Sequence, residues 1–516
     1  MILSIDCGTQ SIRALLFSLD GKIIDKEQVL YEAYKSPKAG WAEQDAEVYW
    51  NGLCKASSSL QKRNPDLYKN IQGIGITTLR STMINMDING NPLRPSIVWL
   101  DQRMAKNTYQ PNKLTAFVFK ALGVKDTLEK LERKGHSNWI KQNQANIWDK
   151  THKYISVSSF LNFKLSGEYK DSTASQIGHI PFNYKKQRWA NSTDFLELSK
   201  DLYPIEKEKL APLVKPGQIT GTILKEAAEL TGIPKDTKII ACGSDKGCET
   251  LGMGVHHTKM ASLSFGTTAT VQTTTDKYFE PIKHLPSYPA LIPEHWNPEI
   301  EIYRGFWMIN WFKKEFALKE VQEAQERNIS AEEILNELLH QSPPGAMGLI
   351  VQPYWTAGLA EKNAKGAMIG FGDVHKKAHV YRAVIEGLCY GLYDGMRRLE
   401  KRGKLKFEKI AVSGGASQSN EICQIAADIF NMKVVRGNTH ETSGLGAAIM
   451  TAYGVGAFKT IKDATKAMVH YADTFIPNTQ NTKLYHALFE EVYLKMYKNL
   501  EPLYKKIREI TGYPEE

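Results

Sequence analysis

The chain has 516 residues, of which 42% are hydrophobic and 24% charged. These values are ordinary for a globular protein, and the length favours two domains over one core. No apolar run reaches the roughly 18 residues of a membrane span, and no basic-then-apolar leader pattern opens the chain. We therefore expect a cytoplasmic protein without membrane partners.

The net charge is +10, and there are six cysteines. The lysines and arginines are scattered and no nucleic-acid-binding motif occurs, so we expect a solvated basic surface and no nucleic-acid partner. Without a CxxC pair, a zinc ribbon or a disulfide framework is not expected. His375 and His379 have a spacing that suits metal ligands, but no third ligand accompanies them, which favours structural or surface histidines.

The first half of the chain alternates short apolar runs with turn signals, a pattern typical of strands and hairpins. Asp20-Gly21 marks a hairpin turn, and Asp45 is placed to cap a helix. In chain order we expect strands at 2–5, 13–19, 22–31, 71–77 and 97–100, a helix from about 45 through 60, helices at 115–122 and 139–149, and a strand at 238–241.

The second half repeats the opening pattern of strand, Gly-Thr turn and strand around Gly266-Thr267. This echo of Gly8-Thr9 predicts two halves of like architecture, with a boundary between residues 245 and 246. In chain order we expect strands at 260–264 and 269–273, helices at 331–341 and 377–401, a strand at 409–412, a helix at 420–430, and a strand at 433–435.

Two turns, at Gly8-Thr9 and Gly266-Thr267, offer the free backbone N–H groups and hydroxyls that phosphoryl transfer needs, and the first also offers charged groups. Walker and protein-kinase motifs are absent. In the turn that follows Asp6, the backbone amides can form an anion-binding nest, to which Thr9 and Ser11 add hydroxyls and Arg13 a charge. Asp6 could hold Mg²⁺ through water. Each turn alone also fits a plain hairpin stabilised by threonine.

A third turn, Gly414-Gly415, follows a strand and precedes a helix. Adjacent glycines let a flat base or a ribose approach the backbone closely. Alone it is a weak signal, but with the two hairpins it favours a nucleotide site.

With three such turns in this order, the chain resembles the superfamily of actin, hexokinase and the heat-shock chaperones. More closely it resembles the FGGY carbohydrate kinases. The most specific block is Gly366-Ala-Met-Ile-Gly-Phe371 followed, after seven residues, by 379–386. Residues 40–45, 99–103 and 441–448 also match family blocks.

The resemblance implies an α/β fold with two actin-like (ribonuclease H-like) domains, 1–245 and 246–516. Each has a mixed central sheet flanked by helices, and ATP and sugar meet in the cleft between them. Asp245 matches the catalytic base, and Arg80, Ser81, Asp245 and Lys246 match sugar-binding positions. The nucleotide-binding positions are Thr9, Gln10, Ser11, Arg13, Gly266, Thr267, Asn310, Gly414, Gly415, Ala416 and Ser419. From local sequence, Asp245 also suits a helix cap, and Arg80 a surface charge.

We therefore expect an ATP- and Mg²⁺-dependent kinase for a small carbohydrate, with a pentulose such as xylulose as the first choice. Blocks 40–45 and 99–103 look xylulokinase-like, whereas the Arg80-Ser81 pair matches neither xylulokinases nor glycerol kinases. Glycerol, ribulose, another polyol or a sugar acid stay open. There are two alternatives to an active kinase. One is a nucleotide-dependent interaction protein of the actin or chaperone kind, and the other is a degenerate sugar binder, which the bulky Phe306-Trp307 pair suggests. The resemblance also suggests a homodimer.

Overall fold

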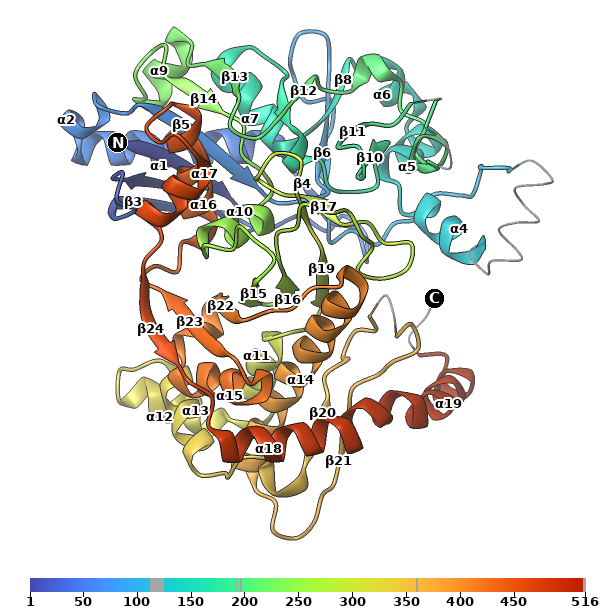
Figure 1. Ribbon diagram of the computed structural model, residues 1–516. Coiled ribbons are helices and arrows are strands. Elements are labelled where there is room, and N and C mark those ends of the chain that lie inside the picture. The colour runs from blue at the N-terminus through green and yellow to red at the C-terminus, as the bar shows by residue number, and fades with distance from the viewer. Residues whose placement is uncertain (112–124, 192, 195–196, 359–360, 514–516) are drawn as a thin grey trace. The chain divides into compact units, whose positions relative to one another are not determined.

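The computed structural model describes residues 1–111, 125–191, 193–194, 197–358 and 361–513 (Figure 1). The chain forms two compact units. Unit 1 contains 1–252, 288–296 and 441–469; unit 2 contains 253–287, 297–440 and 470–516. The units are not two continuous halves, because the segment 441–469 returns to the first. The expected boundary falls at the first residue of helix α10 (Asp245–Gly252).

Unit 1 is built on a six-stranded mixed sheet in the order β13-β14-β5-β1-β2-β3. β1 pairs antiparallel with β2 and parallel with β5. Both faces of β1 and most of β2 are buried, which explains why these strands read as nearly continuous apolar runs. The strands are β1 (Ile2–Cys7), β2 (Ser11–Phe17), β3 (Ile23–Leu30), β5 (Gly73–Thr78), β13 (Ile219–Thr222) and β14 (Lys238–Ile240).

Alternate residues of β2 pack into different cores, because successive side chains of a strand point to opposite faces. Ile12 and Leu16 join a cluster with helix α1 (Ala46–Arg63), whereas Leu15 and Phe17 join one with α16 (Thr442–Gly454). The two helices therefore cover the two faces of the sheet.

A second, four-stranded sheet of unit 1 has the order β4-β7-β6-β8. Its strands are β4 (Glu43–Gln44), β6 (Met83–Met86), β7 (Ser96–Ile97) and β8 (Lys153–Ser156). The remaining helices of the unit are α2 (Pro65–Tyr68), α4 (Lys125–Arg133), α5 (His136–Asn143), α6 (Ala145–Lys150), α7 (Val157–Ser166), α8 (Ser199–Leu202), α9 (Lys225–Thr231) and α17 (Ile461–Met468). Short strands are β9 (Asp171–Ser172), β10 (Phe182–Asn183), β11 (Arg188–Trp189), β12 (Leu213–Val214), β17 (Tyr288–Pro289) and β18 (Trp296–Asn297).

Unit 2 repeats the sheet topology of unit 1 in the order β19-β16-β15-β22-β23-β24. β15 pairs antiparallel with β16 and parallel with β22, as β1 does with β2 and β5. The echo in the sequence is thus a repeated sheet. The strands of this sheet are β15 (Met260–Phe265), β16 (Ala269–Gln272), β19 (Glu299–Ile302), β22 (Lys409–Ser413), β23 (Lys433–Gly437) and β24 (Tyr471–Phe475). A separate two-stranded sheet pairs β20 (Ile350–Gln352) with β21 (Ala367–Ile369).

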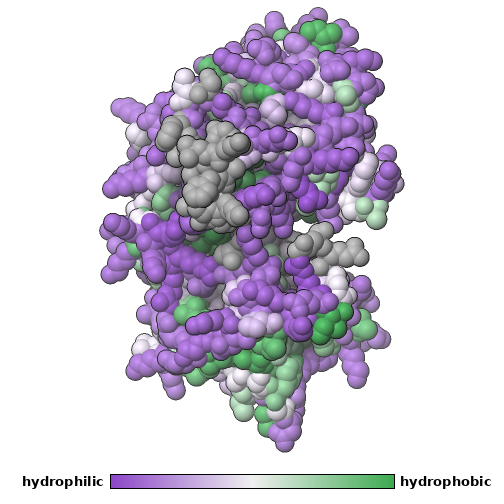
Figure 2. Space-filling model, turned by 90° about the vertical axis from the view of Figure 1, so that its right-hand side faces the viewer, coloured by the Kyte–Doolittle hydropathy of each residue, from purple (hydrophilic) through white to green (hydrophobic). Residues whose placement is uncertain are grey.

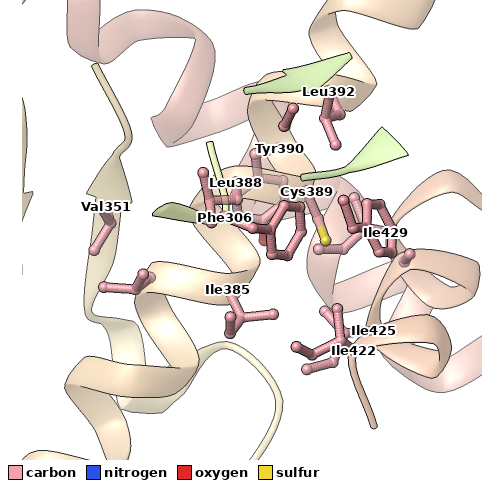
Figure 3. Close-up of a cluster of buried hydrophobic side chains, with 14 of the residues drawn as sticks. Phe306, Val351, Ile385, Leu388, Cys389, Tyr390, Leu392, Ile422, Ile425 and Ile429 are labelled. Atoms are coloured by element: carbon pink, nitrogen blue, oxygen red, sulfur yellow. The ribbon is translucent and has the colours of Figure 1, made fainter. Parts of the chain in front are cut away.

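Helices of unit 2 pack around one apolar core, part of which is shown in Figure 3. Ile385 and Leu388 of α14 and Ile425 of α15 are buried there. The helices are α11 (Trp307–Phe316), α12 (Leu318–Glu326), α13 (Ala331–His340), α14 (Lys377–Gly403), α15 (Asn420–Phe430), α18 (Thr479–Leu488) and α19 (Leu494–Thr511).

The expected mixed sheets flanked by helices are confirmed, and so are most expected elements, within one to three residues at their ends. Asp45 caps α1, since its carboxylate accepts a hydrogen bond from the Glu47 amide. The expected helix at 139–149 is wrong: α5 and α6 are separated at Gln144, whose backbone (φ −141°, ψ 49°) leaves the helical range. The expected strand at 97–100 ends at Ile97. The expected helix at 115–122 lies outside the described residues.

Hydrophilic residues dominate the face shown in Figure 2, and hydrophobic ones form smaller patches. Among the described residues, none of the helices combines the length and the apolar character needed to cross a membrane.

The bulky pair Phe306-Trp307 lies at the start of α11. Phe306 is buried in the unit 2 core, where its ring centroid lies 4.6 Å from that of Phe265 (Figure 3). The Phe306 amide donates to the Gly266 carbonyl at 3.0 Å. Its bulk therefore fills the core beneath the second Gly-Thr hairpin.

Replacing Phe306 by alanine is expected to lower the free energy of unfolding by about 3–5 kcal/mol, because a buried aromatic ring leaves a cavity. Phe316, on the same helix and 47% exposed, is the matched control. Its replacement is expected to cost about 1 kcal/mol or less. Denaturant unfolding of both variants measures the difference, and equal losses would place Phe306 outside the core.

Candidate active site

The first Gly-Thr hairpin joins β1 to β2 and is held by side chains from neighbouring elements. The Gly8 amide donates to the Ser11 carbonyl at 2.9 Å, and the Tyr31 hydroxyl donates to the Gly8 carbonyl at 2.6 Å. Trp99 Nε1 donates to Thr9 Oγ1 at 3.1 Å, and Gln28 donates to the Ser11 hydroxyl at 3.0 Å. Both hydroxyl oxygens act as acceptors here, which leaves their O–H donors for an anion.

Charged groups surround the end of β1. Arg13 Nη1 lies 3.2 Å from Asp6 Oδ2, and Arg13 Nε lies 3.7 Å from Glu441 Oε2. Burial raises the pKa of Asp6 to about 6; Arg13 opposes the rise, and the charges of Asp245 and Glu441 add to it. The predicted phosphate residue Arg13 and the predicted metal residue Asp6 thus form one cluster, which also includes Glu441.

The predicted base Asp245 is the first residue of α10, directly after the strand-end segment Gly243-Ser244. The Ser244 hydroxyl accepts the Gly247 amide at 3.3 Å and so caps the helix. The Asp245 carboxylate accepts a hydrogen bond from the backbone amide of Lys246 at 2.7 Å, and the Asp245 side chain is 35% exposed. Burial raises the pKa of Asp245, whereas Arg80 and Lys246 lower it. Ser244, rather than Asp245, is therefore the N-cap residue of α10.

Close packing of α10 on α16 holds Asp245 in place. A Cβ at Gly446 would overlap the Cys248 carbonyl, so only glycine lets the two helix backbones approach this far. The Ser443 hydroxyl donates to the Asp245 carbonyl at 3.2 Å. The same contact of the two helices therefore positions Asp245 and, just before α16, Glu441.

Arg80 meets Asp245, as expected for two residues of one sugar site. Its Nε lies 3.6 Å from Asp245 Oδ1 and donates to the Ser244 hydroxyl at 3.3 Å. The guanidinium also lies over the ring of Tyr288, 5.2 Å from the centroid. Its side chain is only 16% exposed, so it is not a surface charge.

Ser81 and Lys246 also lie in this part of unit 1. Ser81 has a left-handed backbone (φ 55°), and its amide donates to the Ile177 carbonyl at 3.1 Å. Lys246 Nζ donates to Glu249 Oε2 at 2.7 Å, one turn along α10. The ammonium of Lys246 is therefore directed along its own helix.

In unit 2, the second Gly-Thr hairpin and the Gly-Gly turn lie against each other. Gly414 has φ 85°, and a Cβ on it would be 2.6 Å from the carbonyl carbon of Phe265 and 2.9 Å from the Gly266 nitrogen. Gly415 has open space around it, and Thr267 is exposed. The structure thus brings together two of the three predicted nucleotide turns within this unit and leaves their backbone accessible.

The other predicted nucleotide residues of unit 2 have different settings. Ser419 caps α15 by accepting the Ile422 amide, and its hydroxyl lies 2.8 Å from Asn336 Oδ1. Ala416 is half-buried, and Asn310 is exposed on α11. The Ser419 hydroxyl is therefore already engaged within the protein.

Trp99, Glu441 and Tyr288 were not among the predicted site residues. Trp99 and Glu441 belong to the family blocks 99–103 and 441–448, so that resemblance was a usable signal. Tyr288 comes from a segment between two strands of unit 2 that returns to unit 1, and no local pattern indicates this.

The blocks 40–45 and 99–103 support the site by a buried ion-pair network. Arg103 pairs with Asp101 at 2.7 Å and with Glu43 at 2.8 Å. Its guanidinium also lies 3.8 Å from the Trp41 ring centroid. These contacts hold the segment that carries Trp99 to Thr9.

Comparisons with known proteins define the class. A solved structure described as gluconate kinase from Lactobacillus acidophilus has the same fold, with a TM-score of 0.81 and 22% identity over 98% of this chain and 99% of that one. Xylulose kinase from Lactococcus lactis is 26% identical over 99% of both chains. Gluconokinase from Bacillus subtilis is 28% identical over 98% of this chain and 97% of its own. The fold and these relatives are those of carbohydrate kinases.

The chain belongs to the FGGY family of carbohydrate kinases: the model of the family's N-terminal domain matches residues 1–252, and that of its C-terminal domain matches 261–455. It is accordingly an enzyme that phosphorylates a sugar with ATP. This membership sets aside the alternative of an actin- or chaperone-like interaction protein.

Proposed function

We propose that the enzyme transfers the γ-phosphoryl group of ATP to a hydroxyl of a pentulose such as xylulose, with Asp245 as the general base. The observation that carries this proposal is the pairing of the Asp245 carboxylate with Arg80 at 3.6 Å, at the half-buried start of α10. The similarity over full length to a protein named xylulose kinase supports the choice of sugar.

In this mechanism the Asp245 carboxylate accepts the proton of the sugar hydroxyl as that hydroxyl attacks the γ-phosphorus. Arg80 donates to neighbouring sugar hydroxyls. Burial raises the pKa of Asp245, and the positive charge of Arg80 counteracts that rise. Ser81 and Lys246 complete the sugar-binding set.

The phosphates of ATP are bound by donors of the Gly-Thr hairpins. Thr9 and Ser11 offer hydroxyls whose oxygens already accept hydrogen bonds from the protein, and Arg13 offers positive charge. Gln10 belongs to the same hairpin; Gly266 and Thr267 act in the same way in unit 2. Gly414, Gly415, Ala416, Ser419 and Asn310 are assigned to the adenosine.

Mg²⁺, which neutralises phosphate charge in such reactions, fits the cluster around Asp6 only through water. The described residues contain no group of three or more acidic, histidine or cysteine side chains that could hold a metal directly. The charges of Asp245 and Glu441 raise the pKa of Asp6 and that of Arg13 lowers it, while Lys26 pairs with Glu441 and Arg80 with Asp245. Asp6 would hold the waters of the ion.

A sugar acid such as gluconate is the second candidate substrate. A gluconokinase is among the relatives, and the Arg80 guanidinium has the fork geometry that binds carboxylates. ADP release measured over pentuloses, polyols and aldonates distinguishes the candidates. The highest kcat/KM with xylulose or another pentulose supports the proposal, one with gluconate replaces it, and no turnover with any sugar identifies a degenerate binder.

The pH dependence provides a separate test. Because the pKa of Asp6 is raised to about 6, its carboxylate takes up a proton as the pH falls below that value. The metal-holding form is then lost, so kcat/KM is expected to fall about tenfold per pH unit below about pH 6. A rate profile of the wild type and of Asp6→Asn checks this, and the variant should lack the limb near pH 6. A wild-type profile that stays flat down to pH 4.5 would contradict this role of Asp6.

A further inference from the structure

Three polar residues that the proposed chemistry does not use lie near one another beside Tyr203 in unit 1. The ring of His179 meets the Tyr203 ring edge-on, with centroids 5.7 Å apart. Gly135, which separates Lys134 from His136, lies against the same ring, since a Cβ there would be 2.9 Å from Tyr203 Cδ1. We call Lys134, His136 and His179 the histidine cluster.

The histidine cluster adjoins the proposed sugar-binding residues through the backbone of 177–179. The Ser81 amide donates to the Ile177 carbonyl, and a Cβ on Gly178 would be 3.3 Å from Ser81 Cα. His179 is the next residue. The cluster is therefore next to Ser81 in space, although almost 100 residues separate Ser81 from His179 along the chain.

An aromatic path connects the same backbone to Arg80. The Tyr184 hydroxyl donates to the Gly178 carbonyl and accepts the Gly178 amide, both at 3.1 Å. The Tyr184 ring lies 5.6 Å from the Tyr288 ring, on which Arg80 packs. Arg80 in turn meets Asp245, so the cluster and the proposed base belong to one continuous set of contacts in unit 1.

The side-chain polar atoms of the histidine cluster make no hydrogen bond or ion pair within the described part of the chain. Lys134, His136 and His179 are half-buried. Their polar atoms are not among the fully buried ones that lack a partner, so they are open to solvent or to a ligand. Their setting is that of a ligand-contacting surface.

Both imidazoles are neutral near pH 7. Burial lowers the pKa of His179 to about 3, and the positive charges of His136 and Lys134 lower it further. Burial lowers the pKa of His136 to about 4; Asp101 opposes this, and Arg103 and Arg94 add to it. Burial also lowers the pKa of Lys134 below its usual value.

A neutral imidazole offers one N–H donor and one bare nitrogen acceptor. A hydroxyl group can satisfy both, because it donates and accepts. A carboxylate only accepts, so it can pair with the N–H groups and with the lysine but leaves the bare nitrogens without a donor. Sugar hydroxyls can pair with every polar group of the cluster, whereas a carboxylate leaves part of it unpaired.

We propose that the histidine cluster binds the hydroxyls of the sugar chain that lie away from the reacting one, and so selects a neutral sugar longer than glycerol. This inference rests on the proposed sugar kinase activity and adds residues that determine its specificity. Glycerol would react at Asp245 without reaching the cluster, and an aldonate would lose affinity there.

Steady-state kinetics of His179→Leu and His136→Leu with xylulose, glycerol and gluconate test the proposal. Each variant is expected to raise the KM for xylulose roughly 5- to 10-fold, the equivalent of one net hydrogen bond. The kcat, the KM for ATP and the kinetics with glycerol should stay within about twofold. His179→Gln should restore most of the affinity, because an amide also donates and accepts.

His152→Leu is the matched control. His152 is also half-buried, and its ring meets that of Tyr169 edge-on, with centroids 6.2 Å apart. Its backbone amide donates to the carbonyl of Met86, the last residue of β6, whereas Ser81 lies before the start of that strand. Any of three results would overturn the inference. These are an unchanged KM for xylulose in both cluster variants, an equal rise of that KM in the control, and a wild-type preference for gluconate. A wild type inert towards every sugar would instead overturn the proposed function, and the inference with it.

Discussion

Asp245→Asn is expected to lower kcat by about 10³- to 10⁴-fold while the KM for ATP stays within about twofold. An asparagine keeps the size and the start of α10 but cannot accept the proton of the attacking hydroxyl, and general-base catalysis is worth up to that factor. Ser244, which caps the helix, is untouched. Coupled ADP-release kinetics with the best sugar of the panel measure the loss.

The matched control is Asp201→Asn, because Asp201 also lies in the first turn of a helix of unit 1 and is 41% exposed. It should retain wild-type kcat. If Asp245→Asn kept more than about a tenth of the wild-type kcat, Asp245 would lose its role as the base. Unchanged thermal unfolding of the variant ensures that the lost rate reflects chemistry.

Two neighbouring glycines of unit 2 are expected to respond in opposite ways to added side chains. Gly414→Ala should lower the free energy of unfolding by about 2–5 kcal/mol, because left-handed backbone penalises a Cβ and overpacking adds to the cost. That Cβ would meet the Phe265 backbone at 2.6 Å. The new methyl group should also displace the hairpin at Gly266, and this displacement should weaken ATP binding by at least about tenfold.

Gly415 has no atom within 4 Å of its would-be Cβ. Gly415→Ala should therefore unfold like the wild type. Gly415→Leu should raise the KM for ATP roughly tenfold without loss of stability, because its side chain would occupy space assigned to the nucleoside. Calorimetry and ATP titration of the three variants are the measurements. If the KM for ATP were unchanged in Gly415→Leu, the adenosine would have to bind elsewhere.

Much of this protein is determined locally. The repeated Gly-Thr turns, the cap at Asp45 and an aspartate after an apolar strand are recognisable in sequence, because turn chemistry, capping and strand alternation depend on residues a few positions apart. Those patterns predicted both sheets and placed Asp6, Arg13 and Asp245 near strand ends. The break at Gln144 escaped the same reasoning, because apolar periodicity continues across it.

Only the tertiary structure decided which distant residues meet. Ser443 reaches Asp245 across 198 positions, and Trp99 reaches Thr9 across 90. The histidine cluster joins residues of α5, of the segment before α5 and of the chain around 178, none of which carries a motif. Such contacts follow from packing, in which glycines at Gly446 and Gly414 let backbones touch, and packing depends on the whole fold rather than on local pattern.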